Sequence, residues 1–254
     1  MLKMKIKQGK NKTMVQNTIT YGLVIAFWAV MQILDMTGNM TSLLRGLLVP
    51  ICTYVILALS LNLTVGILGE LSLGHAGFMC VGAFSGAFFT NAMADVIPSV
   101  GVRFAIALVI GAAVAAVFGI IIGIPVLRLK GDYLAIVTLA FGEIIKNLIN
   151  ALYVGKDSSG IHFSMKDAAS LNLDETGDVI IKGAQGITGT PKASTFLIGI
   201  LLILLTLFIV LNLINSRTGR AVMAIRDNRI AAESVGINIT KYKLLAFSIS
   251  ASMA

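Results

Sequence analysis

Charged residues are scarce in this sequence. They make up 13% of its 254 residues, whereas hydrophobic residues make up 57%. A typical soluble domain carries about 25% charged residues, so the scarcity excludes such a domain and indicates a polytopic membrane protein. Acidic residues are the rarer sign, with 12 against 20 Lys and Arg and a formal net charge of +8. The basic residues cluster at the ends of apolar stretches, so the expected partner is the lipid bilayer and no nucleic acid is expected.

Cysteine is nearly absent, and so are the motifs of cofactor chemistry. Cys52 and Cys80 both fall inside apolar stretches, which favours packing and gives no support to a disulfide or a metal site. Glu70 and His75 do not complete a metal coordination set. The phosphate-binding pattern G-x-x-x-x-G-K-[ST] is missing, so we expect no cofactor in this chain.

Long apolar stretches dominate what is present, and they predict an all-α polytopic transmembrane helix bundle. A span needs roughly 20 mainly apolar residues to cross about 30 Å of hydrocarbon. A further stretch begins near Leu244 and is only about 11 residues long at Ala254, so either the chain is a truncated fragment or its end is re-entrant. Six stretches qualify as spans: about 19–36, 46–66, 77–94, 102–125, 133–153 and 194–214.

The distribution of Lys and Arg predicts the orientation. A cytoplasmic N-terminus places 13 of them inside and six outside, with Lys146 inside a span. Residues 1–18 then form a cytoplasmic basic arm, and 19–254 form the transmembrane domain. About 154–193 is an external loop, which we interpret as a folded surface able to meet a partner or cover the entrance of a solute path; a disordered spacer is the alternative. Residues 216–243 form a cytoplasmic segment.

Residues 68–78, LGELSLGHAGF, interrupt an apolar region with three glycines, a glutamate, a serine and a histidine. Irregular backbone at membrane depth is tolerated only where protein buries it or where it lines a watery cavity. Ionisable residues within a span usually mark a pathway or a pairing. The stretch therefore predicts either a broken helix that lines a solute path or a cytoplasmic turn between two spans.

A second polar intrusion lies at 141–150, FGEIIKNLIN. Glu143, Lys146 and Asn147 are spaced i, i+3 and i+4, so they share one helical face. Either Glu143 and Lys146 form a structural pair with the lysine reaching outward, or this face belongs to the solute path.

Small residues in two stretches predict close helix packing. Gly82-x-x-x-Gly86 and Gly119-x-x-x-Gly123 allow helix backbones to approach one another in a membrane.

The cytoplasmic segment predicts one helix over about Thr218–Val235. Its apolar face carries Ala221, Ile225, Ala232 and Val235, and Ile230 stands exposed on the opposite, charged face. Gly236 suits a left-handed C-terminal cap. An exposed isoleucine among charges favours docking on a protein partner over packing on lipid.

These blocks together resemble a known family, the permease subunits of ABC importers for branched-chain amino acids, in particular the permease type with the longer external loop. The resemblance is carried by five blocks of sequence: Leu59–Leu63 leading into Gly69–Phe78, Arg128–Ala135, Thr138–Ile145, Gly186–Gly189, and Gly219–Asn228 continued through Ala231–Ile237.

The resemblance implies a plasma-membrane complex with several partners. These are a second permease subunit, two cytoplasmic ATPase subunits that hold ATP and Mg, and an external substrate-binding protein. It also implies further spans after the equivalent of Ser248–Ser250, and Glu70 departs from a neutral amide common among relatives. Together with the patterns above, it predicts a translocation path that comprises Asn62, Glu70, Ser72, Gly74, His75 and Glu143. The predicted ATPase-coupling residues are Gly219, Arg220, Arg226, Ile230, Ala232, Glu233 and Gly236.

Three functions follow from these observations. The first is a permease that imports branched-chain amino acids by ATP-driven alternating access and does no bond chemistry itself. The second is an ion-coupled secondary transporter that uses Glu70 and Glu143 as coupling carboxylates. The third is an intramembrane enzyme, for which Ser72 with His75 is the nucleophile–base candidate. The sequence leaves open whether urea, amides or other small solutes are the cargo.

Overall fold

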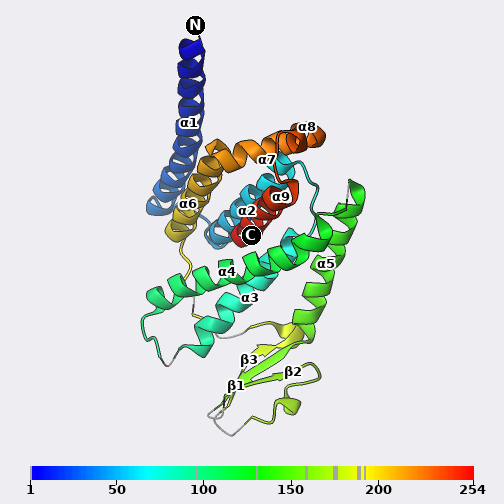
Figure 1. The fold of residues 1–254 in the computed structure, drawn as a ribbon. Helices are drawn as coiled ribbons and strands as arrows, with labels where there is room; N and C mark the ends of the chain where they lie inside the picture. Colours follow the sequence, from blue (N-terminus) through cyan, green and yellow to red (C-terminus); the bar gives the residue numbers. More distant parts are fainter. Residues whose placement is uncertain are drawn as a thin grey trace. The chain divides into compact units, whose positions relative to one another are not determined.

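The computed structural model describes residues 2–94, 96–129, 131–157, 160–173, 177–187, 190–191 and 193–254, with side chains from residue 15 onward. Lys130, Thr188 and Gly189, which belong to the blocks of resemblance, lie outside these residues. The chain divides into two compact units, Met1–Leu59 with Ser194–Ser216, and Ser60–Ala193 with Arg217–Ala254. Figure 1 shows their helices and strands in sequence colours.

The first unit is helical. It contains α1 (Leu2–Met36), most of α2 (Ser42–Asn62) and α6 (Phe196–Asn215). Cys52 on α2 is buried against α6, where a Cβ added to Gly199 would lie 2.8 Å from the Cys52 Cβ. Ile200, Ile203 and Leu207 complete this cluster. Cys52 therefore packs as a small hydrophobe, as predicted.

The second unit is built on α3 (His75–Ala92), α4 (Val100–Val126), α5 (Asp132–Ala151) and α9 (Ile239–Met253). A Cβ on Gly111 of α4 would lie 2.8 Å from the Gly82 carbonyl of α3. A Cβ on Gly119 would lie 2.7 Å from the Ala251 Cβ of α9. The predicted close packing at the small residues is therefore confirmed, and α4 lies against both α3 and α9.

The external loop is folded over its described residues. Strands β1 (Tyr153–Lys156), β2 (Ile161–Ser164) and β3 (Asp178–Lys182) form an antiparallel sheet in the order β2-β1-β3. Short 3₁₀ turns follow at η2 (Ala169–Leu171) and η3 (Gly183–Gln185). Val154, Ile180 and Ile181 are buried with Ala92, which anchors the sheet to the end of α3.

Among the described residues, five helical segments are long and apolar enough to cross a membrane, and they confirm the predicted helix bundle. They are Val15–Met36, Ser42–Leu68, Val100–Val126, Asp132–Ala151 and Phe196–Asn215. The predicted span at 77–94 corresponds to α3, which is not among these five. The last apolar stretch begins at Ile239, about one turn before the predicted start.

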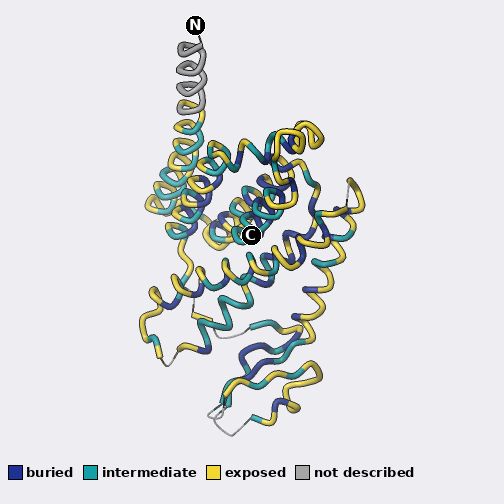
Figure 2. The backbone as a smooth tube through the Cα atoms, viewed as in Figure 1, coloured by how far each residue is buried: buried dark blue, intermediate teal, exposed yellow. Residues whose placement is uncertain are grey.

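Exposed apolar side chains cover the outer faces of the helices. On α4 they include Val109, Val117 and Ile121, and Figure 2 shows exposed residues recurring along this helix and α5. Such faces are typical of contact with lipid, because lipid tails are as apolar as the side chains they meet.

Candidate functional site at the break between α2 and α3

The predicted interruption is a true break between helices. After α2 the chain continues as a π-helix, η1 (Leu63–Leu68), which ends at Gly69 with φ +78°. Residues 70–74 have no regular structure, and α3 begins at His75. π-Helical turns within longer helices occur frequently at functional sites. We refer to residues 69–74 as the break.

The break is held by close backbone contacts. A Cβ on Gly74 would lie 2.6 Å from the Thr138 carbonyl oxygen of α5. The Leu73 amide donates to Thr138 Oγ1 at 3.0 Å, and that hydroxyl donates to the Ala135 carbonyl at 2.9 Å. A Cβ on Gly77, in the first turn of α3, would lie 3.0 Å from the Gly142 Cα of α5. The glycines are therefore required by packing against α5.

A buried hydroxyl on α9 joins both sides of the break. Ser250 Oγ lies 2.8 Å from His75 Nε2 and 2.8 Å from Thr64 Oγ1, and it donates to the Ser60 carbonyl. Because a hydroxyl has one hydrogen, Thr64 Oγ1 and His75 Nε2–H must donate to Ser250. His75 Nδ1 is then the acceptor nitrogen, and it has no hydrogen-bond partner among the described residues; the same is true of Ser72 Oγ.

Glu70 forms an ion pair with Lys243 of α9. The side chains are 16% and 9% exposed, so the two charges neutralise each other inside the fold. The sequence suggested a pathway or a pairing for Glu70, and the structure supplies the pairing. Lys243 and Ser250 were missed as site residues. Their spacing of seven residues places them on one face of the helix, and this spacing was visible in the sequence.

The other predicted path residues are placed separately. Asn62 is exposed at the start of η1, where a Cβ on Gly66 would lie 2.2 Å from Asn62 Oδ1. Glu143 is exposed on α5 and accepts from Lys146 Nζ at 3.2 Å. The buried residues of α5 include Thr138 and Ile145, so Glu143 does not join the buried cluster of Ser72, Gly74 and His75.

The cytoplasmic segment consists of two helices, α7 (Arg217–Asp227) and α8 (Arg229–Ser234), so the prediction of one helix was wrong. Asn228 adopts an extended conformation, and its side chain accepts from the Ala231 amide at 3.0 Å. Asparagine is among the best N-cap residues, which explains the new start. Gly236 follows with φ +83°, and the predicted left-handed cap is confirmed.

The exposed surface of this segment differs in part from the predicted one. Ile230 is 81% exposed, as predicted, but Val235 is also 75% exposed and does not join the apolar face. Ile225 and Ala232 are buried together with Ile239. Ala232 therefore contributes to the core of the segment and not to its surface. Gly219 is likewise buried, whereas Arg220, Arg226, Glu233 and Gly236 are exposed.

Arg226 connects α7 to the break. Its guanidinium donates to the Gly66 carbonyl at 2.8 Å and pairs with Asp227 at 3.1 Å. Its side chain lies over Gly69, where a Cβ would come 2.5 Å from Arg226 Cγ. The break therefore lies beside the segment that is cytoplasmic in the predicted orientation.

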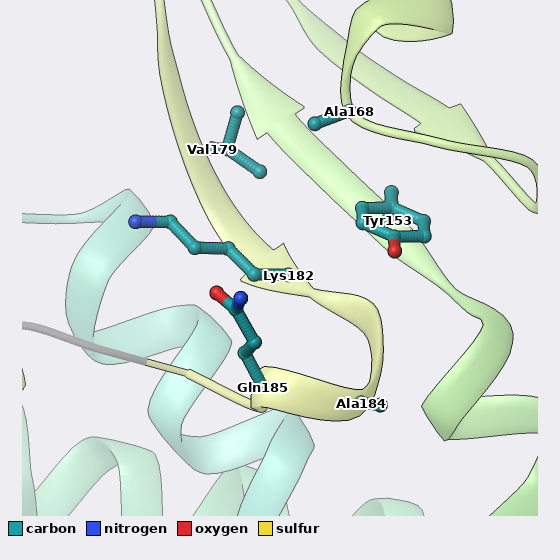
Figure 3. Close-up of a pocket in the computed structure, with 6 residues that line it drawn as sticks. All are labelled: Tyr153, Ala168, Val179, Lys182, Ala184 and Gln185. Atoms are coloured by element: carbon teal, nitrogen blue, oxygen red, sulfur yellow. The ribbon is translucent and has the colours of Figure 1, made fainter.

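A separate cavity of about 450 Å³ lies in the external loop (Figure 3). It opens between β1, β3 and η3, and Lys182 and Gln185 are its long polar side chains. Tyr153, Ala168, Val179 and Ala184 complete the lining. Among the described residues no group of three His, Cys, Asp or Glu side chains could hold a metal ion.

Most of this chain is similar in sequence to known proteins. Residues 43–254 match the family described as branched-chain amino acid transport system / permease component. The chain is similar to the high-affinity branched-chain amino acid transport system permease protein LivM of Salmonella typhimurium and to its namesake from Escherichia coli. Identity is 37% over 210 residues with each, covering 79% of this chain. The chain spans about half the length of these curated relatives, at 48% of each. No solved structure matches the chain.

The matched residues run from α2 through α9 and include both the break and the α7–α8 segment. The resemblance inferred from the sequence blocks is thereby confirmed. The chain is a multi-pass membrane protein and belongs to the family of permease components of branched-chain amino acid transport systems.

Proposed function

We propose that the protein is a permease subunit that imports branched-chain amino acids into the cytoplasm by ATP-driven alternating access. Membership of the family and the names of the two relatives support this cargo. The subunit acts with a second permease, two cytoplasmic ATPase subunits and an external binding protein. ATP and Mg are bound by the ATPase subunits, and this chain does no bond chemistry. Its N-terminus lies in the cytoplasm, in the orientation that the basic residues favour.

The observation that carries the proposal is the physical link between α7 and the break. The α7–α8 segment presents Ile230, 81% exposed, beside the exposed Glu233. An apolar side chain with charged neighbours suits a protein groove. Through Arg226 the same segment contacts Gly66 and Gly69. A movement imposed on α7 and α8 by an ATPase therefore reaches the broken helix directly.

The coupling surface follows from exposure. Ile230 and Glu233 contact the ATPase, and Arg220 and Gly236, which are also exposed, extend this surface. Gly219 and Ala232 are buried and small, and they allow α7 and α8 to pack closely. Arg226 transmits the displacement to the break.

The translocation path is proposed to run along the break and α5. Ser72 and His75 each keep a buried polar atom without a partner among the described residues, and Gly74 lets the chain pass close to α5. Asn62 and Glu143 are exposed and therefore available to a hydrated solute. Glu70 holds the break to α9 through Lys243. An ion-coupled transporter is less well supported, because Glu70, one of its two coupling carboxylates, is paired with Lys243 inside the fold.

The proposal is tested by purifying the full-length protein with its companion subunits. The double variant Ile230→Asp, Glu233→Arg is compared with the wild type and with Lys241→Glu, an exposed charge change on α9 of the same cytoplasmic region. We expect the double variant to lose the ATPase subunits and the stimulation of ATP hydrolysis by loaded binding protein. The control should retain both. A wild-type complex that is intact without any ATPase would contradict the proposal.

A further inference from the structure

Helix α5 carries charged residues where a membrane helix should carry none. Its 20 residues span about 30 Å at 1.5 Å per residue. Glu143 is therefore about 16 Å from the first residue and about 12 Å from the last, close to mid-membrane. Glu143 and Lys146 pair with each other, yet their side chains remain 56% and 59% exposed. A lysine can extend toward the membrane surface, but a glutamate at this depth cannot.

From Glu143 to the end of α5, the exposed polar residues form one continuous stripe. The exposed Asp132 stands apart at the first residue of the helix, and the exposed Ile136 and Leu139 lie between it and Glu143. At 100° per residue, Glu143, Lys146, Asn147 and Asn150 fall within an arc of about 100°. All four are exposed. We call these four residues the polar stripe; it begins at mid-membrane and ends one residue before the helix does.

The remaining circumference of α5 serves two other purposes. One sector is buried in the fold and consists of Leu134, Ala135, Thr138, Ile145 and Ile149. Between this sector and the polar stripe lie Ile144, 60% exposed, and Leu148, 48% exposed. These apolar side chains suit lipid. From Glu143 onward the helix thus has a protein face, a lipid face and a polar face.

The polar face is unsuited to lipid and to close helix packing. Charged side chains facing hydrocarbon are costly, even when paired. Helix–helix contacts in this protein use small residues, as where Gly82 of α3 meets Gly111 of α4. The polar stripe instead presents larger polar side chains that carry hydrogen-bond donors and acceptors. Water satisfies such groups without requiring a complementary surface.

We propose that the polar stripe lines a water-filled path and binds the charged head group of the transported solute. An α-amino acid carries an ammonium and a carboxylate, and both need partners when they leave bulk water. Glu143 accepts from the ammonium, and Lys146 donates to the carboxylate. Asn147 and Asn150 each offer an amide that donates and accepts. The solute class is therefore a zwitterion, not urea or a neutral amide. This assignment of solute rests on the proposed function; the hydration of the stripe does not.

The chain offers a matched test of hydration. Single cysteines are introduced by Asn147→Cys and Asn150→Cys in the stripe and by Ile144→Cys and Leu148→Cys in the lipid sector. None of these changes touches the Glu143–Lys146 pair. The assembled, full-length transporter in vesicles is treated with a membrane-impermeant thiol reagent, and the wild type, with Cys52 buried and Cys80 partly buried, measures the background. Because the ionised thiolate is the reactive form, we expect the stripe positions to react about tenfold faster than the lipid positions.

The proposal would be overturned if both stripe positions reacted no faster than the two lipid-sector positions. It would also be overturned if the stripe positions reacted only with a lipid-soluble reagent. The second readout is uptake of leucine. Glu143→Gln and Lys146→Met should each lower the uptake rate about tenfold, the effect of losing one charge-assisted hydrogen bond. Asp35→Asn and Arg45→Met remove another exposed acid–base pair and should leave uptake unchanged. Unchanged uptake in both stripe variants would reject the head-group role.

The two proposals fail in different ways. A wild-type complex that takes up no amino acid while the stripe is labelled from water would contradict the importer, and with it the head-group role, but not the water-filled path. A complex that imports leucine while the stripe is protected would contradict the further inference alone.

Discussion

Two acid–lysine pairs occur among the described residues of this largely apolar protein, and they differ in sequence separation and in burial. Glu70 and Lys243 are 173 residues apart and lie almost wholly inside the fold. Glu143 and Lys146 are one turn apart on α5 and are more than half exposed. Burial makes the first pair a structural clamp, because removing one partner strands the other charge. Because the second pair is exposed, removing it should cost little stability, and each of its side chains is free to exchange its partner for a solute.

The largest effect should come from breaking the buried pair on one side. Glu70→Gln leaves Lys243 unpaired, and Lys243→Met leaves Glu70 unpaired; each should destabilise the fold by about 3 kcal/mol. Thermal unfolding of the purified protein in detergent measures this. The double variant Glu70→Gln, Lys243→Met should recover most of the loss, because no charge is stranded. A double variant as unstable as the singles would show that the pair is not a clamp.

Removing the Ser250 hydroxyl of α9, which joins the two sides of the break, should have the second-largest effect. Ser250→Ala leaves Thr64 Oγ1, His75 Nε2 and the Ser60 carbonyl without this shared partner. A buried polar group that loses its partner costs about 1–3 kcal/mol, and we expect about 2 kcal/mol here. Ser252→Ala is the control, because Ser252 Oγ bonds only locally to the Ile249 carbonyl at 2.7 Å. Equal melting temperatures for the two variants would contradict the role of Ser250.

A methyl group at Gly69 should lower the stability by less. Comparing it with a methyl group at Gly236 separates the cost of backbone strain from the cost of the contact with Arg226. Gly69→Ala imposes the left-handed backbone penalty of about 1–2 kcal/mol and also meets Arg226 Cγ. Gly236→Ala carries a similar φ, +83°, with no atom within 4 Å. The Gly69 variant should therefore be the less stable of the two in the same unfolding measurement. It should also lower ATPase stimulation by loaded binding protein. Identical behaviour of both variants would argue against a tight α7–break contact.

The smallest effect on stability is expected at the exposed pair. Glu143→Gln should change the unfolding free energy by no more than about 0.5 kcal/mol, since exposed pairs contribute little. The same variant should nevertheless transport poorly, because it loses the carboxylate that is proposed to accept from the ammonium of the solute. Stability is measured by thermal unfolding and transport by leucine uptake in vesicles. A Glu143→Gln protein as unstable as Glu70→Gln would remove the distinction between the two pairs.

Much of the architecture was predictable from sequence, but the assignment of polar residues to partners was not. The apolar runs, the glycine contacts of α3 and α4 and the cap at Gly236 all follow from local patterns. The division of the cytoplasmic segment at Asn228 could also have been predicted, because asparagine is a strong N-cap. The sequence placed Ala232 correctly on the apolar face but did not reveal that Val235 is exposed, because the helix ends after Asp227 and a new one starts after Asn228.

The sequence by itself determined that this protein is a membrane-spanning helix bundle, that the apolar region is interrupted at residues 69–74 and to which family the chain belongs. The length of the apolar stretches, the spacing of the glycines and the motif blocks are local properties, so they can be recognised in the sequence. Only the tertiary structure decided that Glu70 meets Lys243, that Ser250 bridges the break and that Arg226 lies over Gly69. These contacts join residues more than 150 positions apart. The packing of α7 and α9 around the break brings them together, and no local pattern specifies that packing.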